Sequence, residues 1–323
     1  MKRQLQFPPV DVGKVTRYSI RERTNKTSIG AFGHAITPGA GATLFLKSLP
    51  KFLKASDLND FIVLAVQARK RNKPFHLLLG AHTIKVGLSP VIIDLLQRRI
   101  ITGLSFNGAG LIHDLELAFF GGTSEDVQAG LTDGSFGMVR ETGELCAEVV
   151  HLATKEEIGL GAACGLFINR RQAKYRKLSV FAVAHKLSLP VTVHVGIGTD
   201  IINQHPNYDP EKTASASYRD FRILCSVCEQ VDRGGVVANV GSAVILPEVF
   251  LKALTVARNL KRGASRLTTA NFDMIEHYRP SVNVVTRPTF RAGRGFNFVG
   301  HHEIMIPLLA WGLKAGLSRR SDR

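Results

Sequence analysis

The chain has 323 residues and a formal net charge of +16 at pH 7, from 42 lysines and arginines against 26 aspartates and glutamates. Hydrophobic residues make up 45% of the sequence and charged residues 21%, which excludes a wholly disordered protein and is typical of a globular one. A chain of this length can bury a large core in a single domain. The excess of positive charge points to an anionic partner.

Neither a membrane-spanning protein nor a secreted protein is expected. No apolar run reaches the ~18 residues that a membrane-spanning helix needs, and the basic N-terminus MKRQLQFPPV is not followed by the apolar segment of a signal peptide. We therefore expect a cytoplasmic protein with no membrane partner.

Four cysteines are too few for a disulfide framework, and the CxxC at Cys225 and Cys228 lies in a segment with helical apolar spacing. Buried thiols are expected there rather than a metal or redox site.

The N-terminal segment differs from the remainder of the chain. Residues 1–50 are rich in Gly, Thr and Pro and have no clear periodicity before a short helix, so we expect an arm. Residues 51–323 are expected to form one domain. Its first element is a helix over 56–73 whose N-cap is Ser56 or Asp57.

The clearest unit follows this helix. An apolar run at 74–82 is typical of a buried parallel strand, and Ser89-Pro90 is typical of a helix start with a side-chain cap and proline in the first turn. A helix over 90–100, a strand over 101–110 and a helix over 111–121 come next. This order predicts two parallel strands joined by a right-handed crossover.

The same alternation continues to the C-terminus. We expect further helices over 144–153, 156–168, 177–187, up to 230, from Pro247 and over 301–317, and strands over 189–198, 234–244, 267–275 and 281–289. The predicted architecture is an α/β fold with a doubly wound, mostly parallel, Rossmann-like sheet.

Four expected strands end in turns that contain glycine or polar residues, at Gly80–Leu88, Asn107–Gly110, Val195–Asp200 and Asn239–Ala243. The carboxyl ends of parallel strands lie at one edge of a sheet, where ligands of such folds bind and where free N–H groups of helix N-termini hold phosphate. Alternatively, the glycines only permit close packing of helices on strands. No complete GxGxxG follows a strand, so the usual dinucleotide fingerprint is absent.

The block LLLGAHTIKVGLSPVIIDLLQRRIITGLSFNGAGLIHDLEL resembles the nucleotide-binding block of the deoxyhypusine synthase family, and the similarity extends over residues 70–315. The resemblance implies a doubly wound NAD-binding domain and a homo-oligomer, either a dimer or a tetramer. In that family NAD takes hydride from spermidine, and an active-site lysine carries the butylamine group to a protein lysine. Asp200 is similar to the aspartate of the family's Thr-Asp-Gly turn, which implies a catalytic role.

The resemblance also implies which residues contact NAD. These are Gly80, Thr83, Gly87, Ser89, Asn107, Gly108, Ala109, Gly110, Gly241 and Ser242.

The sequence departs from the family at its catalytic lysine. No lysine occurs between Lys261 and Lys314, and arginine cannot replace it because an always-charged guanidinium cannot form an imine. Leu246-Pro247 also stands where the family has a histidine. We therefore expect an NAD-binding enzyme that acts on a polyamine or related amine, without aminobutyl transfer to a protein lysine through an active-site lysine.

Other side chains could complete a site. The segment His301-His302-Glu303 follows Gly300, and one of its histidines could act as a general base oriented by Glu303, or the segment could only cap a helix. Expected substrate contacts are His113, Asp114, His194 and Arg294. Arg294, with Arg287 and Arg291, could bind a carboxylate or phosphate or belong to a solvated loop.

Two other functions stay open at this point. His113 and Glu116 share a helix face and could hold a metal with another histidine, which would suit a metal-assisted or acid–base hydrolase or transferase, although we assign no metal site. The net charge also suits a basic RNA-binding protein, although a nucleotide or small-molecule amine as the ligand is favoured over nucleic acid.

Overall fold

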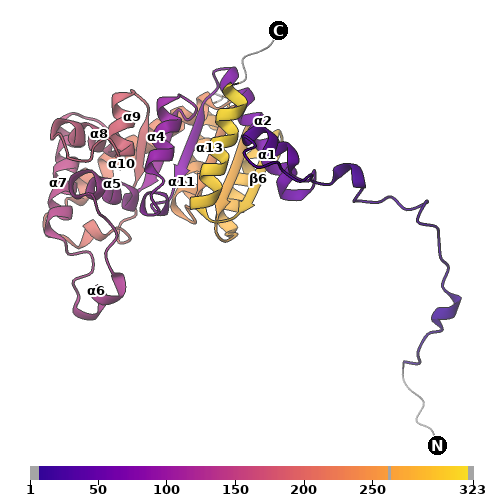
Figure 1. Ribbon diagram of the computed structural model, residues 1–323. Helices are drawn as coiled ribbons and strands as arrows, with labels where there is room; N and C mark the ends of the chain where they lie inside the picture. The colour runs from indigo at the N-terminus through magenta and orange to yellow at the C-terminus, as the bar shows by residue number, and fades with distance from the viewer. Residues whose placement is uncertain (1–6, 261–262, 319–323) are drawn as a thin grey trace, which may run out of the picture.

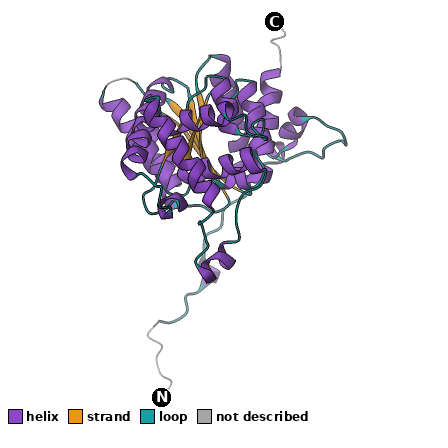
Figure 2. Cartoon of the chain, turned by 90° about the vertical axis from the view of Figure 1, so that its left-hand side faces the viewer, coloured by secondary structure: helices purple, strands orange, loops and turns teal. Residues whose placement is uncertain are grey.

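The computed structural model describes residues 7–260 and 263–318. Its centre is a six-stranded parallel sheet in the order β3-β2-β1-β4-β5-β6, enclosed by helices (Figures 1 and 2). The strands are β1 (Phe75–Leu79), β2 (Gly103–Asn107), β3 (Val191–His194), β4 (Val236–Val240), β5 (Leu267–Asp273) and β6 (Gly293–Val299). The predicted doubly wound α/β fold is confirmed, because the chain order runs outward from β1 on one side and from β4 on the other.

Helices cover both faces of the sheet. One face packs against α2 (Leu53–Lys70), α4 (Ser89–Gln97), α5 (Gly108–Phe120), α9 (Val180–Lys186) and α13 (His302–Ser318), and the other against α10 (Pro210–Gln230) and α11 (Ile245–Asn259). The remaining α-helices are α1 (Ala42–Ser48), α3 (His82–Lys85), α6 (Val127–Asp133), α7 (Arg140–Lys155), α8 (Leu160–Arg170) and α12 (Arg287–Thr289). Short 3-10 helices lie at η1 (Val12–Lys14), η2 (Ile29–Ala31) and η3 (Ile201–Gln204), and η4 (Pro280–Thr286) is a π-helix.

An aromatic cluster fastens α2 to the sheet. The ring of Phe61 lies with its centroid 5.7 Å from those of both Phe272 and Phe296, and Phe272 stacks on Phe298 at 4.7 Å. Such pairs each contribute about 0.5–1.5 kcal/mol beyond the area that they bury. The cluster therefore holds the edge strand β6, which supplies Phe296 and Phe298, in the core.

That edge strand was not predicted. The expected strand at 281–289 is wrong, because this segment forms η4 and α12, and the strand lies at 293–299 instead. The β-branched residues before residue 287 are typical of a strand. Pro288, however, has no N–H to donate to a neighbouring strand, which disfavours a strand here. In β6 only the alternation of Phe296 and Phe298 toward the core marks the strand.

Several helix starts also differ from the expected ones, including the three for which a cap or a proline was named. Helix α2 begins at Leu53 rather than after Ser56 or Asp57, and α11 begins at Ile245, two residues before the expected proline. Ser89 lies inside α4 and makes no side-chain cap, because Leu88 is the N-cap residue.

The free edge of β3 is closed by α10. Ser217 Oγ donates to the Val193 carbonyl at 2.9 Å and accepts from the Val195 N–H at 3.2 Å. The Asp220 carboxylate, fully buried, accepts from the N–H groups of Val193 at 2.8 Å and of Gly161 in the first turn of α8 at 2.9 Å. These side chains satisfy backbone groups that an open sheet edge exposes.

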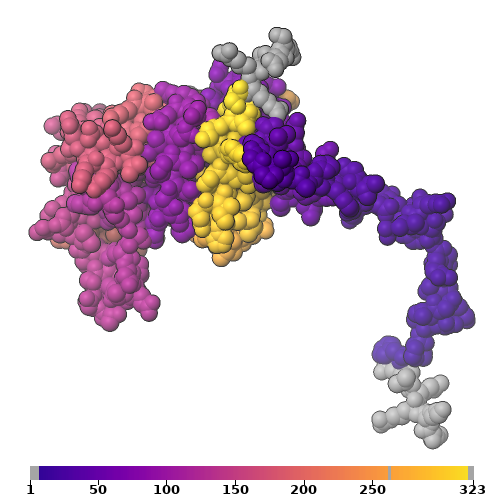
Figure 3. Space-filling view, in the orientation of Figure 1, coloured from indigo at the N-terminus to yellow at the C-terminus, as the bar shows by residue number. Residues whose placement is uncertain are grey.

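Two segments extend from the body (Figures 1 and 3). Residues 7–41 run away from the sheet, whereas α1 packs on α13, with the rings of Phe45 and Trp311 5.9 Å apart. Residues 121–139, which include α6, project from the opposite end. None of the helices in the described ranges combines the length and apolarity needed to cross a membrane. The four cysteines are buried free thiols, which confirms the prediction of buried thiols at Cys225 and Cys228.

Candidate functional site

The strand order changes direction between β1 and β4, so their carboxyl ends form the switch point where ligands of such sheets bind. The two ends meet closely, since the Gly80 N–H donates to the Val240 carbonyl at 2.8 Å. A Cβ added at Gly80 would lie 2.0 Å from the Gly241 carbonyl oxygen, so only glycine fits. Thr83, also at this turn, donates its hydroxyl to the Gly80 carbonyl at 2.8 Å.

A buried histidine lies above the junction, the point where Gly80 after β1 meets Val240 and Gly241 at the end of β4. His302, only 1% exposed at the start of α13, packs against Gly241 and lies 5.5 Å from the ring of His82, centroid to centroid. Its Nε2 lies 3.3 Å from the Phe272 carbonyl and 3.9 Å from Asp273 Oδ1. Burial, with a smaller contribution from His82, lowers the pKa of His302 despite Asp273. The ring is therefore neutral near pH 7.

Three buried polar atoms around the junction have no hydrogen-bond partner. They are Asn239 Oδ1 at the end of β4, Asp273 Oδ2 at the end of β5 and His302 Nδ1. The Asn239 amide is otherwise engaged, because it donates to the Ser242 carbonyl at 3.0 Å and to Asn271 Oδ1 at 2.8 Å. An unpaired buried polar group costs about 1–3 kcal/mol, so this arrangement favours a ligand with hydrogen-bond donors at the junction.

Next to the junction, Asp200 occupies the N-terminus of α5. Its carboxylate accepts from the Gly196 N–H at 3.1 Å and from the Ala109 N–H, and a Cβ added at Gly108 would lie 2.1 Å from Asp200 Oδ2. Burial raises the pKa of Asp200 although these N–H groups oppose the shift. A helix N-terminus favours an anion, and here a side chain of the same protein supplies it. A ligand phosphate at the amides of residues 108–110 would require Asp200 to move.

Asp200 also borders a cavity of about 240 Å³ between α5, the projecting segment 121–139 and the loop before η3. Its polar lining consists of Lys85, His113, Glu116, Ser124, Glu125, Thr199 and Asp200, and its other walls are Ala109, Ile112, Val127, Phe136, Val139 and Ile201. Three carboxylates against one lysine, with apolar side chains between them, suit a ligand with a cationic head and an aliphatic body.

Hydrogen bonds hold Glu116 in place within this wall. Thr123 and Thr142 donate their hydroxyls to the two Glu116 carboxylate oxygens at 2.5 and 2.8 Å, and His113 Nδ1 lies 2.6 Å from the Thr123 hydroxyl. Burial favours the neutral acid, but the hydrogen bonds from His113, Thr123 and Thr142 outweigh it and lower the pKa of Glu116. Glu116 is therefore ionised near neutral pH.

Two expected substrate contacts lie in the interior instead. Asp114 is fully buried and caps α9, accepting from the Ser179 hydroxyl at 2.5 Å and the Val180 N–H at 2.9 Å. Burial raises the pKa of Asp114 to about 7. His194 faces α10, with Nε2 3.0 Å from the Thr192 hydroxyl.

The other expected residues are at the surface. Arg294 lies at the amino end of β6, away from the junction, where it pairs with Asp60 at 2.8 Å. His301 and Glu303 form an exposed pair, 3.7 Å apart, beside the buried His302. Gly87 lies in an exposed turn with φ of 77°. Sequence reasoning missed Asp273, which its place at a strand end could have indicated, and Glu125, for which no signal existed.

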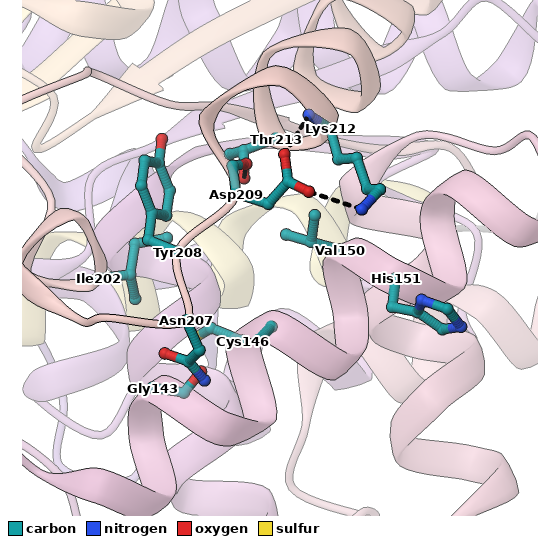
Figure 4. A pocket seen from close by; sticks show the side chains of 11 residues that line it. Gly143, Cys146, Val150, His151, Ile202, Asn207, Tyr208, Asp209, Lys212 and Thr213 are labelled. Atoms are coloured by element: carbon teal, nitrogen blue, oxygen red, sulfur yellow. Dashed lines mark hydrogen bonds and ion pairs between the residues drawn. The ribbon is translucent and has the colours of Figure 1, made fainter.

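A second cavity, of about 150 Å³, lies between α7 and the segment 202–213 (Figure 4). Its charged side chains satisfy each other, because Lys212 Nζ lies 2.6 Å from Asp209 Oδ2. Figure 4 shows His151 and Asn207 pointing away from that pair, so no set of polar groups converges there. Within the described ranges no group of three or more His, Cys, Asp or Glu side chains is placed to hold a metal ion.

No protein-family model matches this sequence, and no curated protein matches it. Among solved structures, a protein assigned as a deoxyhypusine synthase from Entamoeba histolytica matches with a TM-score of 0.52 and 10% identity, over 90% of this chain and 99% of that one. A protein assigned to the LOR/SDH group from Methanococcus maripaludis matches with a TM-score of 0.50 and 12% identity, over 88% and 72% of the two chains.

A third match is AgrE in complex with ornithine and NAD+, with a TM-score of 0.51 and 12% identity, over 83% of this chain. The chain spans only 34% of AgrE and 32% of a cyanobacterial arginine dihydrolase, ArgZ, that also matches. At these identities the matches show the fold. The protein is thus an α/β protein with a doubly wound sheet, distantly similar in fold to deoxyhypusine synthase.

Proposed function

We propose that the protein is an NAD-dependent enzyme that acts on a polyamine or related amine, without aminobutyl transfer through an active-site lysine. The observation that carries this proposal is the pairing of two sites at one sheet edge. A junction with unpaired buried acceptors adjoins a cavity whose wall holds Glu116, Glu125 and Asp200. The short helix α3 links them, with His82 at the junction and Lys85 at the cavity.

NAD would supply hydrogen-bond donors to the unpaired acceptors at the junction. Its ribose hydroxyls and carboxamide N–H groups are hydrogen-bond donors, which Asn239 Oδ1 and Asp273 Oδ2 lack. Gly80 and Gly241 carry no side chain, which lets the two strand ends and His302 approach each other closely at this junction. Bound NAD would accept a hydride from the substrate.

The amine would lie in the cavity. An ammonium group pairs favourably with carboxylates. Glu116 is held ionised, and Asp200 supplies a second acid to the cavity wall. His113, which lines the same cavity and contacts the Thr123 hydroxyl, would help to orient the amine. His302, neutral and with a free Nδ1, would take a proton. The neighbouring His301 and Glu303 would lie beside it at the surface.

Thermal unfolding with NAD, with spermidine and with both would test the proposal. A ligand at about a hundred times its Kd stabilises the folded state by roughly 2.7 kcal/mol, so each should raise the Tm. Asp200→Asn should lose most of the spermidine shift and keep the NAD shift, whereas Glu156→Gln, an exposed carboxylate paired with Arg170, should keep both.

The same measurements separate the alternatives. A Tm shift with zinc or manganese but none with NAD would favour a metal-assisted hydrolase. RNA binding that falls steeply with salt, without any small-molecule shift, would favour an RNA-binding protein. Either result would refute the proposal.

A further inference from the structure

A continuous chain of hydrogen bonds crosses three strands of the sheet beneath α10. His76 Nε2 on β1 lies 2.8 Å from Ser105 Oγ on β2, which lies 2.6 Å from Thr192 Oγ1 on β3. Thr192 Oγ1 in turn lies 3.0 Å from His194 Nε2. All four side chains are buried, and the two hydroxyls are 0% exposed.

The two ends of this chain of hydrogen bonds lie at opposite ends of the strands, His76 at the amino ends and His194 at the carboxyl ends. His76 lines a cavity of about 230 Å³ together with Pro74, Thr102 and Pro190, which lie at the amino ends of β1, β2 and β3. His194 is the last residue of β3, at the carboxyl edge, and the loop that follows it leads to Asp200 on the wall of the amine cavity.

Counting the protons shows that the two histidines are coupled. The three hydrogen bonds need three donated protons, and the Ser105 and Thr192 hydroxyls supply one each. One imidazole must donate the third proton from its Nε2. The other imidazole must accept a hydrogen bond at its Nε2, and its own proton is then on Nδ1. The tautomer of His76 therefore fixes the tautomer of His194.

We propose that these four side chains conduct protons through the sheet, from the carboxyl edge to the cavity at the amino ends. The direction rests on the proposed function. Oxidation of a protonated primary amine by NAD+ transfers a hydride and yields a protonated imine, NADH and one proton, which must leave the site.

Each transfer balances in protons. His194 gains a proton on Nδ1 and passes its Nε2 proton to Thr192, Thr192 passes its proton to Ser105, and Ser105 passes its proton to His76 Nε2. The Nδ1 proton of His76 then leaves into the cavity. One transit therefore leaves the proton of His194 on Nδ1 and that of His76 on Nε2, the opposite pair of tautomers to the starting one. No residue holds a net charge afterwards, which suits two rings whose pKa burial lowers to about 3 and about 4.

The first test is nitrogen NMR of the protein labelled at histidine, with the two rings assigned through His76→Asn and His194→Asn. The fractions of each ring in the Nε2–H tautomer should add up to one, and both rings should exchange tautomers at one shared rate. Thr192→Val should abolish both relations, and Thr192→Ser should restore them.

The matched control is Thr269→Val, which removes another fully buried hydroxyl, one without a partner, from β5. It should leave both relations intact. Unrelated tautomer fractions in the wild type, or coupling that survives Thr192→Val, would overturn the proposal. If Thr192→Val does not fold, Ser105→Ala interrupts the same chain.

The second test follows proton release with an indicator dye and NADH by absorbance in a single turnover with spermidine. Thr192→Val should slow proton release by on the order of a hundredfold while the first hydride transfer keeps its rate. Equal release in the variant and the wild type would refute conduction. If no amine is oxidised, the proposed function fails, whereas the NMR result still decides whether the tautomers of His76 and His194 are coupled.

Discussion

Asp220→Asn tests the account of the buried carboxylate that closes the edge of β3. Oδ2 of Asp220 accepts from the N–H groups of Gly161 and Val193, whereas Oδ1 is buried without a partner. An asparagine oxygen can occupy the first position, so the variant keeps these hydrogen bonds and loses only the ionisable group.

The magnitude follows from the pKa. Burial raises the pKa of Asp220 from its ordinary value of 3.8 to about 7. The folded protein therefore binds this proton more tightly than the unfolded chain does, and its stability falls as pH rises from about 4 to about 7. The loss above that window amounts to roughly 4 kcal/mol, which the asparagine variant does not suffer.

Denaturant unfolding at about pH 4 and about pH 8 measures the difference between variant and wild type. We expect the two proteins to differ little at the lower pH and the variant to be more stable at the higher pH. Asp114, which also has a pKa of about 7, remains in both proteins, so the difference isolates Asp220. Asp220→Ala should instead be less stable at both pH values, because it leaves backbone N–H groups unpaired. A stability difference between Asp220→Asn and wild type that does not change with pH would show that Asp220 has no raised pKa in the folded protein.

Three further predictions concern the junction, the core and the cavity. Gly80→Ala should lower the free energy of unfolding, measured with denaturant, by about 1–3 kcal/mol or more, because its Cβ would meet the Gly241 carbonyl. Gly122→Ala, with open space around it, should change that free energy little. Phe298→Ala should cost about 3–5 kcal/mol in the same assay, since this ring is 2% exposed; a cost below about 1 kcal/mol would contradict the packing. Because burial raises the pKa of Asp200, calorimetry should find that spermidine binds more tightly as pH rises and Asp200 ionises; an affinity independent of pH would count against that role.

The parallel α/β architecture could be predicted from the order of apolar runs and glycines along the chain. Apolar runs such as those of β1 and β4, each followed by glycine and then by a helix, are typical of strands buried on both faces and joined by right-handed crossovers. The glycines at positions 80 and 241 were correctly placed at strand ends for the same reason. Local pattern failed where the signal was ambiguous, as at 281–289, where a β-branched run proved helical.

Which polar side chains share a site could be seen only once the elements were placed in space. Asp114 and Asp200 are both acidic residues near expected strand ends, yet one caps α9 in the interior and the other lies against α5 beside the amine cavity. Glu125 reaches the same cavity from the projecting segment, far from any strand. Spacing along a chain fixes neighbours within one helix or strand. Contacts between elements depend on crossover geometry and on the burial of each side chain, which no local pattern encodes.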